Sequence, residues 1–203
     1  MSSIYGEYGP SLDKVMEEMR TILESIDERI FAETGEHIYE HFNMRIKSEE
    51  SMREKCIKKG LPETPFSALH EIWDAIGIRI VTAFRDDIWA IVEEIRRMDR
   101  VRVVKEKDFV HHAKSNGYRS FHMILQLSTD FPDVEGNNPG RYYVELQIRT
   151  IAMDSWASLE HKMKYKKHVE NQKLLEAELK RCADELAACD VSMQTIRNMI
   201  RES

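Results

Sequence analysis

The stretch RYYVELQIRT, residues 141–150, alternates apolar and polar side chains along its whole length. A period of two is typical of a β-strand that buries one face and leaves the other open. The expected buried face carries Tyr142, Val144, Leu146 and Ile148, and the opposite face carries Tyr143, Glu145, Gln147 and Arg149. The sequence therefore predicts a sheet whose polar face presents a carboxylate, an amide and a guanidinium from one rigid strand.

The segments around this strand predict a mixed α/β domain. Further strands are expected at residues 76–84, 101–110 and 120–127. Helices are expected along the apolar repeat from Leu12 to Ile30, from the N-cap Ser48 to the C-cap Gly60, at 85–99 and after 150. Loops are expected at residues 61–67, 111–119 and 129–140. These elements predict one α/β (α+β) domain with a mixed sheet, covered by helices at both termini.

A regular apolar repeat follows in the C-terminal helix. Its members recur at alternating steps of four and three residues: Leu175, Leu179, Cys182, Leu186, Cys189, Met193, Ile196 and Ile200. Nearly four heptads of this kind favour a helix that packs along a partner helix, in its own chain or in another.

Length and composition are those of a globular protein with one domain. The chain has 203 residues, and no apolar run approaches the roughly 20 residues of a membrane span. Its three cysteines are an odd number without metal-binding spacing: Cys56, Cys182 and Cys189. We therefore expect a cytoplasmic protein without structural zinc and without a membrane partner.

Charge is distributed unevenly along the chain, whose formal net charge is -6. Residues 1–40 carry ten acidic and three basic side chains, whereas residues 41–60 carry six basic and three acidic ones. A local basic cluster in an acidic protein suits a small polyanion better than a long nucleic acid. A solvated helix face explains the same cluster, so charge alone leaves both readings open.

Two carboxylates are placed where strands would hold them rigidly. Asp74 directly precedes the strand that carries Arg79, and Glu145 lies on the polar face of the last strand. Paired carboxylates without a Cys/His cluster suit Mg²⁺, which prefers oxygen ligands and bridges phosphate groups. The alternative is ordinary salt bridges, between Asp74 and Arg79 or a lysine and between Glu145 and Arg149.

Three cations precede these carboxylates: Arg45, Lys47 and Lys55. An arginine can stack on a base and bind phosphate, whereas a lysine acts as a point charge. The sequence contains neither a GxxxxGK[ST] nor a GxGxxG motif, so side chains and metal would have to hold any phosphates.

The segment KSNGYRSFH, residues 114–122, combines a turn with several ligand-capable side chains. Asn-Gly is a strong signal for a hairpin turn, and a turn is the simple interpretation. The other interpretation is a nucleotide clamp, in which Tyr118 stacks on a base and Asn116 reads its edge. Lys114, Arg119 and His122 would then reach phosphates.

Four stretches resemble the small alarmone synthetases, the single-domain relatives of RelA/SpoT-type (p)ppGpp synthetases. They are RIKSEESMREK (45–55), DAIGIRIV (74–81), KDFVHHAKSNGYRSFH (107–122) and VELQIRTIAMDSWASLEHKMKYK (144–166). The resemblance implies a nucleotidyltransferase-like mixed sheet with extra terminal helices. It implies one synthetase domain over residues 1–203, with a catalytic core at about 40–166, flanking helices at 1–35 and 170–203, and no hydrolase domain. Homotetramers are common in the family, so a homo-oligomer is expected.

The same resemblance implies a Mg²⁺-dependent GTP pyrophosphokinase, with ATP and GDP or GTP as substrates. Pyrophosphate would pass from ATP to the acceptor 3′-hydroxyl, giving ppGpp or pppGpp and AMP. Asp74 and Glu145 would hold the metal, and Glu145 would help to deprotonate the hydroxyl. The ATP contacts implied are Arg45, Lys47, Ser51, Lys55 and Arg79. The acceptor contacts implied are Lys107, Lys114, Asn116, Tyr118, His122 and Gln147. Lys107 lies in KEKD (105–108), similar to the basic form of that loop, which suits a single metal ion.

Departures from the family pattern leave several points open. Ala113-Lys114-Ser115-Asn116 replaces a Pro-Lys-Pro-Asn pattern, so the acceptor can be GMP, GDP or GTP. The HFNMR segment (41–45) differs from His-Val-x-x-Arg, so an allosteric alarmone site is not implied. One alternative is a toxic relative that pyrophosphorylates the tRNA 3′ end, with HKMKYKKH (161–168) as its docking face. Another is an inactive regulator that binds nucleotide or RNA.

Overall fold

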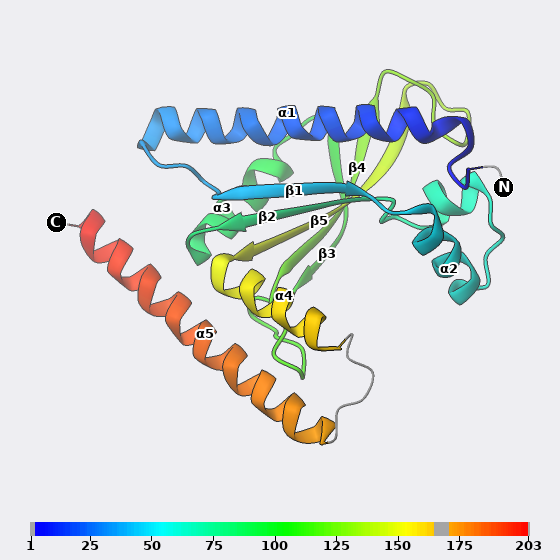
Figure 1. Cartoon of the computed structure of the whole chain (residues 1–203). Coiled ribbons are helices and arrows are strands. Elements are labelled where there is room, and N and C mark those ends of the chain that lie inside the picture. Colours follow the sequence, from blue (N-terminus) through cyan, green and yellow to red (C-terminus); the bar gives the residue numbers. More distant parts are fainter. Residues whose placement is uncertain (1–2, 165–170, 203) are drawn as a thin grey trace.

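The computed structural model describes residues 3–164 and 171–202 (Figure 1). The elements follow one another as η1 (Gly6–Tyr8), α1 (Gly9–Thr34), β1 (His41–Ile46), α2 (Glu49–Lys59), the π-helix η2 (Ser67–Glu71), β2 (Ile76–Thr82), α3 (Arg85–Arg96), β3 (Val101–Asp108), β4 (Phe121–Thr129), β5 (Gly140–Thr150), α4 (Ile151–Lys164) and α5 (Gln172–Arg201). In Figure 1, α1 lies along one side of the sheet, and α4 and α5 lie on the other.

The five strands form one mixed sheet in the order β1-β2-β5-β4-β3. Strands β2 and β5 are parallel, and the other neighbouring pairs are antiparallel. Strand β5 is the central strand, paired with β2 on one side and with β4 on the other. The mixed α/β fold expected from the sequence is confirmed, and β5 is the strand whose alternation was quoted above.

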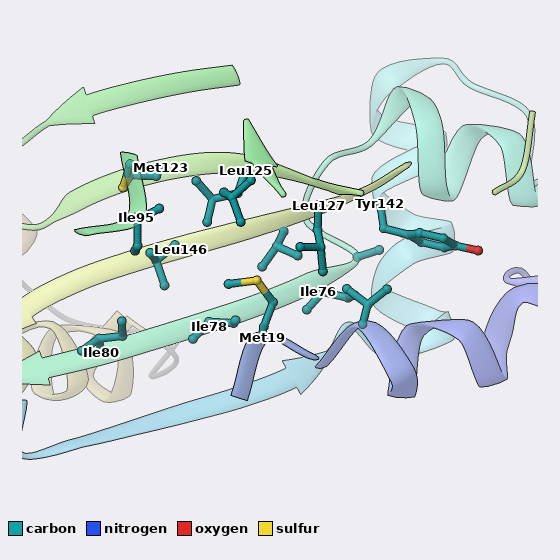
Figure 2. Close-up of a cluster of buried hydrophobic side chains, with 14 of the residues drawn as sticks. Met19, Ile76, Ile78, Ile80, Ile95, Met123, Leu125, Leu127, Tyr142 and Leu146 are labelled. Carbon is teal, nitrogen blue, oxygen red and sulfur yellow. The ribbon is translucent and has the colours of Figure 1, made fainter. Parts of the chain in front are cut away.

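One face of the sheet is the apolar core. The apolar side chains of β5 alternate as expected, and α1 and α3 cover them from the same side. Figure 2 shows this packing, with Met19 of α1 and Ile95 of α3 among strand residues that include Ile76, Ile78, Ile80, Met123, Leu125, Leu127, Tyr142 and Leu146. Each fully buried aliphatic side chain contributes about 1.5–3 kcal/mol. The apolar face thus holds the strands in register while the polar face stays free for chemistry.

Helix α2 begins and ends where its capping residues predict. The Ser48 hydroxyl accepts a hydrogen bond from the Ser51 amide at 3.3 Å, and Gly60 closes the helix at φ 67°. The following segment differs from expectation, because residues 65–67 of the expected loop are already helical and lead into η2. Pro65 fits the first turn of a helix, and the Thr64 hydroxyl accepts from the Ser67 amide at 3.2 Å.

The apolar repeat of α5 is divided between the core and the surface. Leu179 is buried and packs with Trp156 of α4, so a partner helix in the same chain is found for the first part. Farther along, Met193, Ile196 and Ile200 are 51–69% exposed. The inner face there is polar instead: Asp190 accepts a hydrogen bond from Thr150 at 2.6 Å. The buried positions after Leu179 are Ala183, Asp190 and Arg197, so the later members of the repeat face outward.

Candidate active site

Two rows of side chains cross the polar face of the sheet. Strand register aligns Asn43, Arg79, Gln147, His122 and Lys107 in one row. The adjacent row contains Arg45, Gly77, Glu145, Ile124 and Lys105. Residues from five separate strands are thus brought together, and candidates for the donor and acceptor sites share one surface.

Glu145 stands between two cavities on this face. The larger, about 320 Å³, is lined by residues that include Lys55, Asp74, Lys107 and His122 as well as Glu145. The smaller, about 200 Å³, is lined by Asn43, Met44, Arg45, Gly77, Ile78, Arg79, Glu145 and Gln147. A carboxylate shared by two cavities can meet a group bound in either of them.

Gly77 keeps the floor of the smaller cavity open between Arg45 and Glu145. A Cβ atom at this position would lie 3.9 Å from Cγ of Arg45, which is ordinary van der Waals contact. The backbone therefore tolerates a Cβ atom here, and a larger side chain would extend into the cavity that Gly77 lines with Arg45 and Arg79.

Asp74 is held between two lysines. The Lys55 ammonium bonds its Oδ2, and the Lys47 ammonium lies 3.1 Å from the same atom. Burial by itself raises the pKa of Asp74, but Lys55 and Lys47 lower it below its ordinary value. The carboxylate is therefore ionised at neutral pH.

The salt-bridge alternative is correct for Asp74 in part, since lysines do pair with it. Arg79 does not: it lies 3.4 Å from Asp154 of α4. Glu145 is not paired with Arg149 either, because Arg149 donates to Asp154 at 3.0 Å. Glu145 instead accepts a hydrogen bond from the Gln147 amide at 3.2 Å. Its side chain thus remains directed into the site and not into an ion pair with its own strand.

The carboxylates fit a magnesium ion that is completed by substrate oxygens. Oδ1 of Asp74 is buried and accepts no hydrogen bond from any described residue. Asp74 and Glu145 line the same cavity. No three His, Cys, Asp or Glu side chains within residues 3–164 and 171–202 are grouped to hold a metal. Magnesium commonly takes one or two protein carboxylates and fills its remaining positions with phosphate and water.

Cations surround the larger cavity from two sides. Lys55 and Lys59 enter it from α2, and Lys105 and Lys107 enter it from β3. The intervening Glu106 is neutralised by the Arg96 guanidinium through two hydrogen bonds of 3.1 and 2.7 Å. Positive charge therefore dominates the β3 wall. Ser51, a predicted phosphate contact, accepts a hydrogen bond from the Ser48 hydroxyl at 2.9 Å at the start of α2.

Tyr118 is the centre of a hydrogen-bonded chain. Its hydroxyl accepts from the Arg149 guanidinium at 2.7 Å and lies 2.8 Å from Nε2 of His122. An arginine can only donate, so the hydroxyl keeps its own proton, which it can donate to Nε2 when that nitrogen of His122 is unprotonated. Burial, and then the charges of Arg149, Lys114 and Lys107, lower the pKa of His122 to about 4. A neutral His122 agrees with this chain, and a neutral imidazole can meet a ligand only as a hydrogen-bonding group and not as a cation.

The base-stacking surface of Tyr118 is covered in this conformation. The Lys114 ammonium lies 4.6 Å from the ring centroid, and Tyr118 lines neither the larger nor the smaller of the two cavities beside Glu145. Asn116 donates to Glu160 at 3.1 Å and accepts from the Tyr118 amide at 3.1 Å. The Arg149 guanidinium also lies over this ring, 5.2 Å from its centroid, so a base that stacks on Tyr118 has to displace at least one of these cations. The turn interpretation of this segment is right, and the clamp stays a prediction.

Arg119 was expected to reach phosphates and is directed elsewhere. Its guanidinium donates to the Val110 carbonyl at 2.8 Å and lies 4.0 Å from Asp184 of α5. The neighbouring residues alternate sides as the chain enters β4, so Tyr118 and Arg119 cannot both face the site.

Sequence reasoning missed an aromatic wall of the larger cavity. Trp73 lines this cavity and stacks on Tyr143, with ring centroids 5.3 Å apart. Tyr143 was correctly placed on the polar face of β5, two residues before Glu145. Its stacking on Trp73, the residue before Asp74, joins side chains far apart in the chain, and the sequence does not reveal it.

The low pKa of His122 predicts an acid-sensitive fold. An unfolded histidine titrates near 6.5, so the unfolded chain binds more protons than the folded chain between about pH 4 and 6.5. Stability contributed by neutral His122 is complete above that window and is lost as the pH falls through it, by at most about 3 kcal/mol. Urea unfolding at pH 7.5 and 5 should show a smaller loss in His122→Gln than in the parent. Equal losses in both proteins would contradict the prediction.

Comparison with known proteins gives the family of this chain. The sequence model described as "Region found in RelA / SpoT proteins" matches residues 44–170, so the chain belongs to this family. GTP pyrophosphokinase YwaC of Bacillus subtilis is 37% identical over 166 residues, which cover 82% of this chain and 77% of that protein.

Solved structures agree. Small alarmone synthetase 2 from Bacillus subtilis matches with a TM-score of 0.80 and 34% identity, covering 93% of this chain and 95% of that one. Small alarmone synthetase 1 from the same organism, bound to its product pppGpp, matches with a TM-score of 0.77 and 29% identity, over 93% and 94% of the chains. It is also known bound to AMPCPP, at a TM-score of 0.75 and 27% identity, over 97% and 96%.

These findings confirm the resemblance to small alarmone synthetases and agree with the predicted pyrophosphokinase class. No helix within the described residues is long and apolar enough to cross a membrane. The basic stretch 161–168, the candidate tRNA-docking face, extends into residues 165–170, which lie outside the described part of the chain.

Proposed function

We propose that this protein transfers the β,γ-pyrophosphoryl group of ATP to the 3′-hydroxyl of GDP or GTP. The main support for this proposal is that Glu145 lines both cavities and shares the larger one with the ionised Asp74. A group transfer between two bound nucleotides requires such a shared boundary. Membership of the RelA/SpoT family, and the pppGpp and AMPCPP bound to a structural neighbour, support the same reaction.

The linings of the two cavities support different roles for them, one for the ATP base and one for the phosphates. Arg45 and Arg79 line the smaller cavity, where their planar guanidiniums would hold the adenine of ATP. The lysines of the larger cavity would bind the ATP phosphates, which would lie next to Glu145. They would also bind the phosphates of the acceptor. The acceptor base would stack on Tyr118 once the Lys114 ammonium has moved off its ring. Gln147 and His122 would each contact the acceptor.

The proposed step balances as an in-line displacement. The acceptor 3′-oxygen forms a bond to the β-phosphorus of ATP, and the bond from that phosphorus to the α,β-bridging oxygen breaks. AMP leaves with the electron pair, and the 3′-hydroxyl proton passes to the Glu145 carboxylate and then to solvent. Mg²⁺ bound by Asp74 and Glu145 would neutralise charge on the phosphate oxygens. Lys47 and Lys55 keep Asp74 ionised for that purpose.

Other predictions from the sequence remain proposals. They are a single synthetase domain with its core at about 40–166, a cytoplasmic location and a homotetramer. The exposed apolar residues of α5, Met193, Ile196, Met199 and Ile200, are compatible with contacts between copies of the chain. The tRNA 3′ end stays as the second candidate acceptor, because GMP, GDP, GTP and the last nucleotide of tRNA all carry a free ribose 3′-hydroxyl.

An acceptor panel tests the proposal. Purified protein with ATP and MgCl₂ is expected to form AMP and a 3′-pyrophosphorylated product with GDP or GTP, seen by thin-layer chromatography. GMP in the same panel gives the acceptor preference. AMP formation with tRNA but with no guanine nucleotide would support the tRNA alternative instead. The absence of product with every acceptor would refute pyrophosphoryl transfer. Omission of MgCl₂ with added EDTA should abolish product formation.

A further inference from the structure

The turn that carries Tyr118 rests directly on helix α5. Gly117 has φ +92°, and a Cβ atom placed on it would lie 2.4 Å from Cβ of Ala183. No two non-bonded carbon atoms approach so closely, so a side chain at 117 must move the turn away from the helix. We expect a larger side chain at 183 to do the same. The fit depends on the smallest residue on one side and a single methyl group on the other.

A small apolar cluster joins the same helix to the ring of Tyr118. Trp156, Leu179 and Ala183 are 4%, 8% and 4% exposed, and Tyr118 packs against them. The Trp156 indole donates a hydrogen bond to the Leu179 carbonyl at 2.8 Å, which fixes α4 to α5. The centroids of the Trp156 and Tyr118 rings are 6.5 Å apart. This cluster is separate from the main core, so α5 is what closes it.

The far end of α5 is anchored independently. Arg197, 9% exposed, donates to Asp87 of α3 at 2.5 Å and to Glu36 at 2.6 Å, and its guanidinium lies 4.3 Å from the Phe84 ring centroid. Such a buried charge network specifies one position for the helix. Ala183 lies between the two anchored positions of α5, Leu179 and Arg197, so the helix is held in place on both sides of its contact with Gly117.

We propose that Ala183 is a positioning residue for the acceptor nucleotide and acts through Gly117 and Tyr118. The helix supports the turn from behind, and the Arg149–Tyr118–His122 chain holds the ring from the front. Acceptor affinity is thus set partly by a helix that contributes no group to the substrate. This inference rests on the proposed function, because it assigns the acceptor to the Tyr118 side.

The test enlarges Ala183 and compares two ligands. Ala183→Leu is expected to weaken GDP binding in calorimetry by about tenfold and to raise the KM for GDP similarly, because a small displacement of a positioning group has effects of this size or greater. Binding of AMPCPP and the KM for ATP should change less than twofold. Ala177→Leu makes the same substitution on the exposed side of α5 and should change neither. Equal weakening of both ligands would overturn the inference.

A double-variant cycle asks whether the effect passes through Tyr118. Tyr118→Ala should weaken GDP more than AMPCPP, and adding Ala183→Leu to it should cause little further loss. Additive losses would show that Ala183 acts by another route. If thermal melting shows that Ala183→Leu does not fold, Trp156→Phe replaces it; loss of its hydrogen bond to Leu179 should weaken GDP about threefold and leave AMPCPP unchanged. An unchanged GDP affinity in that variant refutes the inference.

The binding measurements separate this inference from the proposed function. A wild-type protein that binds GDP but produces no AMP would refute pyrophosphoryl transfer, and the Ala183 comparison would still give an answer. A wild-type protein that turns over normally, with GDP affinity indifferent to Ala183 and Trp156, would refute only the positioning role.

Discussion

Glu145→Gln is expected to reduce kcat by about 10²- to 10⁴-fold, the range that a positioned general base contributes. Glutamine keeps the shape of the side chain and an oxygen that can accept from Gln147, which lies 3.2 Å away in the native protein. It removes the charge that, in the proposed reaction, would take the 3′-hydroxyl proton and bind Mg²⁺. The loss should fall on kcat, with the thermal melting temperature almost unchanged, because Glu145 has a place in the cavities and not in the core.

A second carboxylate of the same cavity provides the control for Glu145. Glu71 also lines the larger cavity, but its side chain accepts a hydrogen bond from the Ser67 hydroxyl at 2.6 Å. Glu71→Gln makes the same chemical change and should retain activity within a fewfold range. Initial rates of AMP formation at saturating ATP and GDP measure both variants. Comparable losses in the two would mean that overall cavity charge, and not a base at Glu145, supports the reaction.

Asp74→Asn is the second change with a large expected effect, a loss of activity of at least about 100-fold, since charge placed at a transition state is worth several kcal/mol. The variant removes the charge that Mg²⁺ would meet at the buried Oδ1. It also leaves Lys47 and Lys55 facing a neutral amide, which should cost about 1–3 kcal/mol of unfolding free energy. A higher MgCl₂ concentration should be needed for half-maximal activity.

The two consequences of Asp74→Asn can be separated with a charge-balanced variant. Asp74→Asn combined with Lys55→Met removes one unpaired cation and should recover part of the unfolding free energy, measured in urea. Activity and the MgCl₂ requirement should not recover, because the carboxylate is still missing. Recovery of activity along with stability would show that Asp74 supports the fold and not the reaction.

The structure also explains why one segment supports two descriptions. Residues 114–122 are a turn entering β4, as Asn-Gly indicates, and Gly117 has the positive φ that such a turn requires. The same turn presents Tyr118 to a hydrogen-bonded chain with Arg149 and His122. A backbone motif and a ligand site are therefore compatible, since the turn sets the backbone and the side chains remain free for another use.

What the sequence by itself determined was local and periodic. Alternation assigned the polar and apolar faces of β5, and capping residues placed both ends of α2, because these signals depend on neighbours in the chain. Residue types likewise indicated carboxylates for a metal and cations for phosphate. The family resemblance added the roles of individual residues, and its assignment to the RelA/SpoT family is confirmed.

Only the tertiary structure decided which of these residues meet. The strand order β1-β2-β5-β4-β3 places Arg45 and Lys105 at opposite ends of one row with Glu145 between them, and no local signal specifies that order. It also turned Arg119 away from the site, covered Tyr118 with Lys114 and placed Ala183 behind Gly117. Such contacts join residues far apart in the chain, and they depend on how apolar faces pack together, which periodicity along a single segment does not encode.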